Sequence, residues 1–395
     1  MIGVSKPGSE FKRIPLLVSF EEQVRSSRKD VYGSLGARVA VTAQLLRGDE
    51  PSDTIFVTIH QIGSQAYLPV FSGLAAAGFH VLAAANRYIS GDFPLQIENV
   101  ILDLAACVRY AKEKLGYKRV ILVGWSGGGS VISGYQAEAE DKRVTANAAG
   151  EYSPLADTDL IPADGVVLAA PHRSRHKLLA DFIDPAIVDE NDPYNRDPDL
   201  DLYPLTGERE LPLDRAWLSR YREAQVARSA RITAWVKEQM AILAERGDPS
   251  GERAFVVHGT MADPRWVDIT IDPNERAKGS YIGDPRTAND SLSALGRCTS
   301  LRGWLSQWSL ETAQFDAVDA VGRIKAPLLL IVNDADDACP TTHTDAIWEA
   351  MDKTSGSKHH IAGANHYYLG KDQRSQLAEA VQTITDWHAS LCQQA

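Results

Sequence analysis

The chain has 395 residues, of which 44% are hydrophobic and 24% charged, and its formal net charge is −11. This composition is that of an ordinary globular protein with enough residues for a large core. The acidic balance argues against a nucleic-acid partner, which requires a basic face, and no apolar stretch approaches the roughly 18 residues of a membrane-spanning helix.

The N-terminal segment and the cysteines indicate where the protein resides. Lys12 and Arg13 precede only a short apolar run, too short for the apolar region of a signal peptide. The cysteines are scattered and form neither a CxxC pair nor a zinc-binding spacing; they are Cys107, Cys298, Cys339 and Cys392. We therefore expect reduced thiols and a cytoplasmic location.

Strand and helix signals alternate up to Pro171, which is the pattern of an α/β sheet. The expected strands are Ile14–Phe20, Ala37–Leu46, Thr54–Ile59, His80–Ala85, Arg119–Val123 and Gly165–Ala170. Helices are expected over Gln65–Ala77 and over Leu95–Leu115, where apolar residues recur at helical spacing. Another buried strand, Pro327–Val332, follows much later in the chain.

The alternation stops between Pro171 and about Arg323. Residues Asp181–Pro212 are rich in Asp and Pro, so we expect an irregular loop there. Leu213–Arg246 is expected to be a long amphipathic helix, and another helix is expected near Leu301–Leu310. Five of the eight tryptophans lie in this region: Trp217, Trp235, Trp266, Trp304 and Trp308.

A G-x-S-x-G sequence, Gly124–Gly128, directly follows the expected strand Arg119–Val123. A buried strand that ends in this pattern and continues into a helix is typical of a nucleophile elbow. The turn raises the serine above the sheet, so the residues two before and two after it must be small. The helix that follows would direct free N–H groups at a developing oxyanion. Ser126 is therefore the candidate nucleophile.

A serine nucleophile requires a base, and the base requires an acid that orients it. The expected strand Pro327–Val332 leads into Asn333–Pro340, which contains three aspartates at the sheet edge where ligands bind in α/β folds. Farther on, Gly363–Tyr368 follows a short expected strand, His359–Ile361, and contains His366. The candidate triad is Ser126, Asp336 and His366, in that order along the chain.

With these pieces the chain resembles the serine hydrolases of the α/β-hydrolase superfamily that carry a large lid. The matching segments are Gly124–Gly128, Asn333–Pro340, Gly363–His366 and His60–Gly63. The resemblance implies a mostly parallel central sheet flanked by helices, with a large, mainly helical insertion. It implies a core domain of residues 1–171 and 323–395 and a lid of residues 172–322.

The resemblance also selects the acid and the base. The acid loop of the family often reads G-x-x-D-x-x-x-P, which places Asp336 at the acid position when Pro340 comes last, with Asn333 in place of the glycine. Asp334 and Asp337 are then loop-capping or solvated carboxylates. The alternatives to His366 are His359 and His360, but both lie in the expected strand.

His60-Gln61-Ile62 stands where the family has a His-Gly-x segment that supplies an oxyanion donor, with Gln61 in place of the glycine. The resemblance implies the N–H groups of Ile62 and Gly127 as donors, with Gln61 as the alternative to Ile62. A simple strand-ending turn is the other interpretation. The side chains of Gln61 and Trp125 are expected to contact the substrate.

Two further segments are expected near the site without a chemical role. His258-Gly259-Thr260 imitates the His-Gly motif, but it precedes the acid in the chain, so we expect a turn of the lid that lines the pocket. Asn86-Arg87-Tyr88, after its strand, is expected at the pocket rim. Most of the tryptophans are expected to pack in the core of the lid, and a cap rich in tryptophan suits a bulky apolar or aromatic substrate.

The resemblance implies a hydrolase that cleaves a carboxylic ester or lactone through an acyl-enzyme, without metal or organic cofactor. Two alternatives use the same triad: hydrolysis of a carbon–carbon bond in a ring-cleavage diketone, and acyl transfer to an acceptor other than water. A non-catalytic binding protein of the same fold is the alternative from another class. The expected partner is a small apolar or aromatic molecule, and the sequence leaves a homo-oligomer open.

Overall fold

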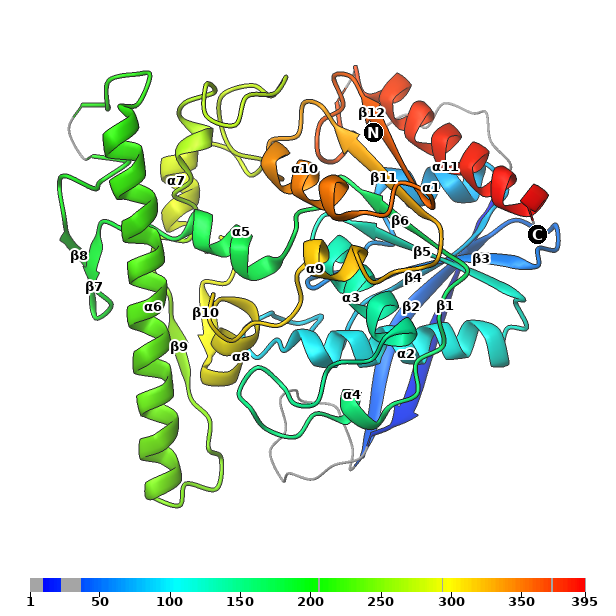
Figure 1. The fold of residues 1–395 in the computed structure, drawn as a ribbon, viewed down its shortest axis with the longest axis horizontal. Coiled ribbons are helices and arrows are strands. Elements are labelled where there is room, and N and C mark those ends of the chain that lie inside the picture. The colour runs from blue at the N-terminus through cyan, green and yellow to red at the C-terminus, as the bar shows by residue number, and fades with distance from the viewer. Residues whose placement is uncertain (1–9, 23–36, 205–206, 293, 371, 395) are drawn as a thin grey trace.

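The computed structural model describes residues 10–22, 37–204, 207–292, 294–370 and 372–394. Its centre is an eight-stranded sheet in the order β1-β2-β4-β3-β5-β6-β11-β12 (Figure 1). The strands are β1 (Lys12–Glu21), β2 (Arg38–Arg47), β3 (Thr54–Thr58), β4 (His80–Ala84), β5 (Arg119–Trp125), β6 (Gly165–Ala169), β11 (Leu328–Asn333) and β12 (Gly356–Ile361). β1, β2 and β4 pair antiparallel, and the strands from β4 to β12 run parallel. The mostly parallel sheet expected from the sequence is confirmed.

Helices cover both faces of the sheet. One face packs against α1 (Pro69–Ala76) and α11 (Arg374–Gln394), and the other packs against α2 (Ile97–Glu113), α3 (Gly128–Glu140), α4 (Pro154–Asp157), α9 (Ala317–Val321) and α10 (Thr341–Ala350). In β5, Val120 and Leu122 join one apolar cluster, whereas Ile121 and Val123 join the other. Burial on both faces explains why the central strands are continuous apolar runs.

Helix α1 begins four residues later than the sequence pattern suggests, at Pro69 rather than Gln65. A proline disfavours helical backbone in the residue before it but suits the first position of a helix. Accordingly, Leu68 is extended, with φ −65° and ψ 140°, and Pro69 begins the helix.

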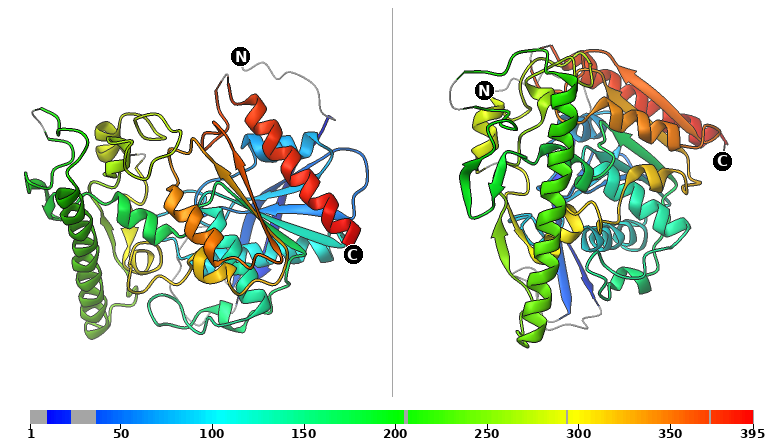
Figure 2. Two further views of the ribbon diagram at one scale, coloured as in Figure 1. Left: turned by 45° about the horizontal axis from the view of Figure 1, so that its top comes forward. Right: turned by 60° about the vertical axis from the view of Figure 1, so that its left-hand side comes forward.

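Between β6 and β11 the chain forms a large insertion at one side of the sheet (Figure 1). Its elements are α5 (Arg175–Phe182), β7 (Ile187–Asp189), β8 (Asp192–Arg196), α6 (Arg215–Glu245), β9 (Ala254–Val256), the 3₁₀ helix η1 (Pro264–Trp266), α7 (Pro285–Asp290), β10 (Cys298–Ser300) and α8 (Leu301–Gln307). Helix α6 runs along the side of the insertion that is remote from the sheet (Figure 2).

The sequence suggested an irregular loop over Asp181–Pro212, but the segment is not wholly irregular. It contains the end of α5 and the antiparallel pair β7 and β8. Arg196 at the end of β8 bonds to Asp184 at 2.9 Å and to Asp201 at 2.6 Å. These contacts join residues that are separated along the chain, so the Asp- and Pro-rich composition does not reveal the pairing.

Two tryptophans form the centre of the insertion. The rings of Trp304 and Trp308 stack at 5.1 Å with an interplanar angle of 6°. The Trp304 indole N–H donates to Thr233 Oγ1 at 2.9 Å, which joins α8 to α6. Core packing, the role expected for most tryptophans of this region, therefore describes both residues.

The sequence-based expectations on membranes and cysteines agree with the described residues. No helix among them combines the length and apolarity needed to cross a membrane. All four cysteines carry free thiols, two of them buried and two exposed.

Candidate active site

Ser126 occupies the sharp turn between β5 and α3. Its φ of +53° is in the left-handed region, which is strained for a residue with a side chain and is found at functional sites. A Cβ atom at Gly124 would lie 2.7 Å from the carbonyl oxygen of Gly128, and one at Gly128 would lie 2.7 Å from that of Ile59. The two glycines are therefore required by the close approach of the backbone around the serine.

The three candidate catalytic residues converge beside this turn. His366 Nε2 lies 3.0 Å from Ser126 Oγ, and His366 Nδ1 lies 2.8 Å from Asp336 Oδ2. Asp336 and His366 are buried, at 4% and 2% exposure. The other carboxylate oxygen of Asp336 accepts the N–H groups of Ala338 and Cys339, each at 2.8 Å. These two bonds orient the carboxylate toward the imidazole.

The alternative acids and bases from the sequence lie elsewhere. Asp334 contacts His360 Nδ1 at 2.8 Å, and His359 contacts Glu379 at 2.9 Å, both at the outer edge of the sheet. Burial raises the pKa of the Asp337 carboxyl group, and the neighbouring charge of Asp336 raises it further. The structure thus groups only Asp336 and His366 with the serine.

The loop that carries His366 is held by side chains that the sequence did not assign to this task. Asn333, which stands in place of the family's glycine, donates to the carbonyl oxygen of Asn365 at 2.9 Å and accepts from the Tyr368 hydroxyl at 2.7 Å. Trp125 donates its indole N–H to the carbonyl oxygen of His366 at 3.1 Å, and its ring lies 4.4 Å from the imidazole. Both residues orient the base.

The segment after β3 lies over the start of α3. Asn86 is buried beneath it and donates to the carbonyl oxygens of His60 and Gln61, each at 2.7 Å. The expectation that Asn86–Tyr88 reaches the pocket rim is therefore wrong. These residues follow β4 into the core, where Arg87 pairs with Asp103 at 2.8 Å and Tyr88 is buried.

A small cavity of about 60 Å³, the catalytic cavity, lies above Ser126. Its wall includes Ser126, His366, Gln61 and Trp125, together with apolar side chains of the insertion such as Leu178. None of the five tryptophans of the insertion is part of this wall, as far as the described residues show, so they provide no argument for a bulky substrate. His258 is not part of it either; its carbonyl oxygen accepts from Arg228 at 2.9 Å.

Two segments of the insertion contact the acid loop directly. Trp266 donates its indole N–H to the carbonyl oxygen of Asp337 at 2.9 Å, and Asn274 donates its amide to the carbonyl oxygen of Asp336 at 2.8 Å. The Glu275 carboxylate accepts the N–H of Gly363 at 2.6 Å, at the start of the histidine loop. The insertion thus supports both loops that carry the acid and the base.

Substituting Asn274 by alanine should therefore affect catalysis as well as stability. The substitution removes the bond to Asp336 and two bonds that the amide oxygen accepts from Arg276, at about 1 kcal/mol each, and a displaced acid loop is expected to lower kcat by about tenfold. Asn191→Ala, on an exposed turn where the amide contacts only Asp189, is the matched control. An unchanged kcat in Asn274→Ala would contradict the supporting role of this contact.

Three buried histidines near the site are held neutral. Burial lowers the pKa of His60 to about 4, and it lowers the pKa values of His172 and His343 well below their ordinary 6.5. Protonation therefore favours the unfolded chain, where the pKa is about 6.5. The stability that these neutral rings contribute is present above pH ~6.5 and is lost as the pH falls toward the folded pKa.

We expect the thermal midpoint to fall steeply between pH 6.5 and 4, because each such histidine costs ~1.4 kcal/mol per pH unit in this window. Melting curves across this range test the expectation. His60→Gln should make the thermal midpoint depend less on pH. A wild-type midpoint that stays constant from pH 7 to 5 would contradict a stabilising role of the neutral histidines.

One group of three potential metal ligands occurs among the described residues: Asp336, Cys339 and His366, whose ligand atoms lie within 4.8 Å of one another. The Asp336 oxygens are already hydrogen-bonded to His366 and to two backbone N–H groups. Burial raises the pKa of the Cys339 thiol well above its ordinary value, which disfavours the thiolate that binds metals. The donor set fits the triad better than a metal centre.

Solved structures resemble the whole chain. A siderophore hydrolase, EstB from Aspergillus fumigatus, gives a TM-score of 0.52 at 13% identity over 92% of this chain and 96% of that one. The α/β-hydrolase GrgF from Penicillium sp. sh18 gives 0.50 at 13% identity over 96% and 97%. Neither a protein-family model nor a curated protein matches the sequence. The sheet order, the elbow and these likenesses together establish that the chain has the α/β-hydrolase fold.

Proposed function

We propose that the protein is a serine hydrolase that cleaves a carboxylic ester or lactone, with residues 172–322 as the lid over its site. The observation that carries the proposal is the continuous hydrogen-bonded series from Ser126 Oγ through His366 to Asp336, at 3.0 and 2.8 Å. These are hydrogen-bonding distances for a nucleophile, its base and the group that orients the base.

In the proposed reaction, His366 Nε2 takes the Ser126 proton while Oγ attacks the substrate carbonyl carbon. The tetrahedral intermediate collapses as the imidazolium returns the proton to the leaving alkoxide, which departs as the alcohol. Water then attacks the acyl-enzyme with the same base, and the acid is released. Asp336 keeps Nδ1 protonated and stabilises the imidazolium.

The geometry favours Gln61 over Ile62 as the first oxyanion donor. His60 Nδ1 lies 3.1 Å from the Ile62 backbone nitrogen and 2.9 Å from the Ile62 carbonyl oxygen, so the Ile62 backbone faces that ring. Within the described residues, the backbone N–H groups of Gln61 and Gly127 have no intramolecular acceptor. Two such free groups beside the nucleophile are what a tetrahedral oxyanion requires, and each donor contributes about 3 kcal/mol in known cases.

The substrate is proposed to be apolar or aromatic around the scissile carbonyl. The apolar and aromatic part of the catalytic cavity wall is Leu178, Leu179, Tyr281, Leu295 and Tyr367, and its polar part includes His60, His172 and Arg175. A fluorophosphonate probe tests the proposal, because it labels only an activated serine. We expect labelling of the folded protein, with peptide mapping placing the adduct on Ser126.

The reaction class is tested by a panel of p-nitrophenyl esters, aromatic lactones and a ring-cleavage diketone. We expect turnover of esters or lactones. Turnover of the diketone alone would establish carbon–carbon bond hydrolysis in its place. Folded protein that neither takes the label nor turns over any substrate would establish the binding role.

A further inference from the structure

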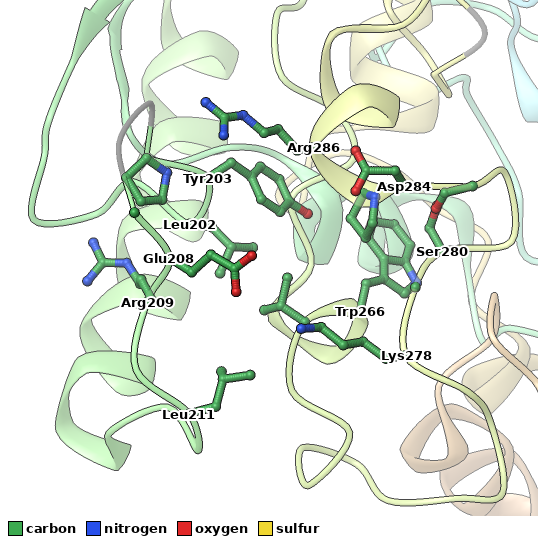
Figure 3. A pocket seen from close by; sticks show the side chains of 16 residues that line it. Leu202, Tyr203, Glu208, Arg209, Leu211, Trp266, Lys278, Ser280, Asp284 and Arg286 are labelled. Atoms are coloured by element: carbon green, nitrogen blue, oxygen red, sulfur yellow. The ribbon is translucent and has the colours of Figure 1, made fainter.

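A second and larger cavity, the distal cavity, lies within the insertion (Figure 3). Its volume is about 490 Å³, within the usual range of small-molecule sites, whereas the catalytic cavity has only about 60 Å³. The wall includes Leu202, Tyr203, Glu208, Trp266, Val267 and Lys278. The volume of the catalytic cavity is that of only a few water molecules, so most of any substrate must lie outside this cavity.

Two aromatic side chains that contact each other line the two cavities, one each. Tyr281 lines the catalytic cavity, and its ring centre lies 6.4 Å from that of His366. Trp266 lines the distal cavity, and its ring centre lies 6.2 Å from that of Tyr281. Tyr281 and Trp266 are therefore a ring pair that joins the wall of one cavity to the wall of the other.

Tyr281 is a weakly held, partly buried side chain. Among the described residues, its hydroxyl group makes only a 3.9 Å contact with the sulfur of Met261. The residue lies in a tight turn closed by reciprocal Ser280–Gly283 backbone bonds at 3.1 and 3.0 Å. Gly279 and Gly283 flank it with φ values of +122° and +114°, and a Cβ at either would meet no atom within 4 Å. The Tyr281 ring can therefore be displaced without breaking a strong hydrogen bond, whereas Trp266 stays bonded to the acid loop.

The chemistry of the distal cavity selects an amphiphilic occupant. The Tyr203 hydroxyl is already bonded to a carbonyl oxygen at 3.0 Å, so this half-buried residue contributes its ring, whereas Trp266, bonded likewise at 2.9 Å, is only 1% exposed and offers little surface. Leu202 and Val267 add apolar surface. At the exposed rim, Glu208 and Lys278 make no ion pair or side-chain hydrogen bond within the part of the chain that is described, and Figure 3 shows them around the same opening.

We propose that the distal cavity binds the part of the substrate remote from the scissile carbonyl, an apolar or aromatic group with a hydroxyl or amide substituent at its edge. The ring would lie against Tyr203 and Val267, and the substituent would reach Glu208 and Lys278. Tyr281 moves aside to connect the two cavities. This inference rests on the proposed hydrolase function and adds the subsite that selects the substrate.

The test fills the distal cavity and compares two esters. Val267→Trp places a large ring at the half-buried cavity wall, and Leu211→Trp does so at a residue that is 42% exposed and folds with less perturbation. Val226→Trp, at a 51% exposed position of α6, is the matched control. The esters are p-nitrophenyl acetate and p-nitrophenyl ω-phenyloctanoate, of which only the second reaches past Tyr281.

We expect both filling variants to lower kcat/KM for the phenyloctanoate by about tenfold to hundredfold, the contribution of one buried phenyl ring. The kcat/KM for the acetate should change less than about twofold in the three tryptophan variants. Tyr281→Ala should raise the phenyloctanoate-to-acetate ratio. Equal losses on both esters, or no loss on either in a variant that melts like the control, would overturn the subsite.

A binding measurement keeps this inference separate from the proposed reaction. Isothermal titration of Ser126→Ala with ω-phenyloctanoic acid should show binding that Val267→Trp weakens by at least about tenfold. If the acid binds but the folded wild-type protein takes no fluorophosphonate label, the hydrolase proposal is refuted and the distal binding site is retained. If the wild-type protein is labelled and turns over the acetate, but Ser126→Ala does not bind the phenyloctanoic acid, the distal binding site is refuted and the hydrolase proposal is retained.

Discussion

Replacing Ser126 by alanine is expected to lower kcat by about 10⁵- to 10⁶-fold, the largest effect of any single change in this protein. The substitution removes the oxygen that lies 3.0 Å from His366 Nε2, and with it the acyl-enzyme route. The oxyanion donors and the binding cavity remain, so a small residual rate over water persists. Stopped assays with a p-nitrophenyl ester and fluorophosphonate labelling both measure the change.

The neighbouring thiol cannot replace the missing hydroxyl group. Cys339 Sγ lies 3.9 Å from Ser126 Oγ, but burial raises its pKa well above the ordinary value, so the reactive thiolate is scarce. Ser375→Ala, at an exposed position of α11, controls for the substitution itself and should leave kcat unchanged. A Ser126→Ala protein with more than about a tenth of the wild-type rate would exclude the serine mechanism.

Replacing Asp336 by asparagine is expected to lower kcat by about 10⁴-fold, with a small effect on KM. The side chain keeps its shape, but its amide group would donate to His366 Nδ1 rather than accept from it. The imidazole would then carry its proton on Nε2, directed at Ser126 Oγ, and could not act as the base.

The same loop provides a close control for this change. Asp334→Asn alters a half-buried carboxylate two residues away, whose partner is His360 at the sheet edge. We expect it to retain activity within about threefold. A loss in Asp334→Asn equal to that in Asp336→Asn would show that the acid loop as a whole, and not one carboxylate, determines the rate.

The predicted core elements follow from local rules of the sequence. Continuous apolar runs such as Val120–Val123 predict strands buried on both faces, and helical spacing over Leu95–Leu115 predicts α2 (Ile97–Glu113). The elbow is partly local, because Gly124 avoids contact with the backbone of Gly128 within the same turn, whereas Gly128 avoids the distant carbonyl oxygen of Ile59. The order of serine, aspartate and histidine then indicates which distant residues the parallel strand ends bring together.

Other features depend on contacts between residues that no local pattern connects, and only the tertiary structure decided them. Asn86 supports the loop of His60 from another strand, and Asn274 holds the acid loop from within the insertion. Trp266 faces a cavity rather than Ser126 because the fold of the insertion, not its composition, sets where each ring points. Spacing along a chain encodes the elements and the order of the triad, whereas cavity volumes and supporting bonds arise only when separate segments pack together.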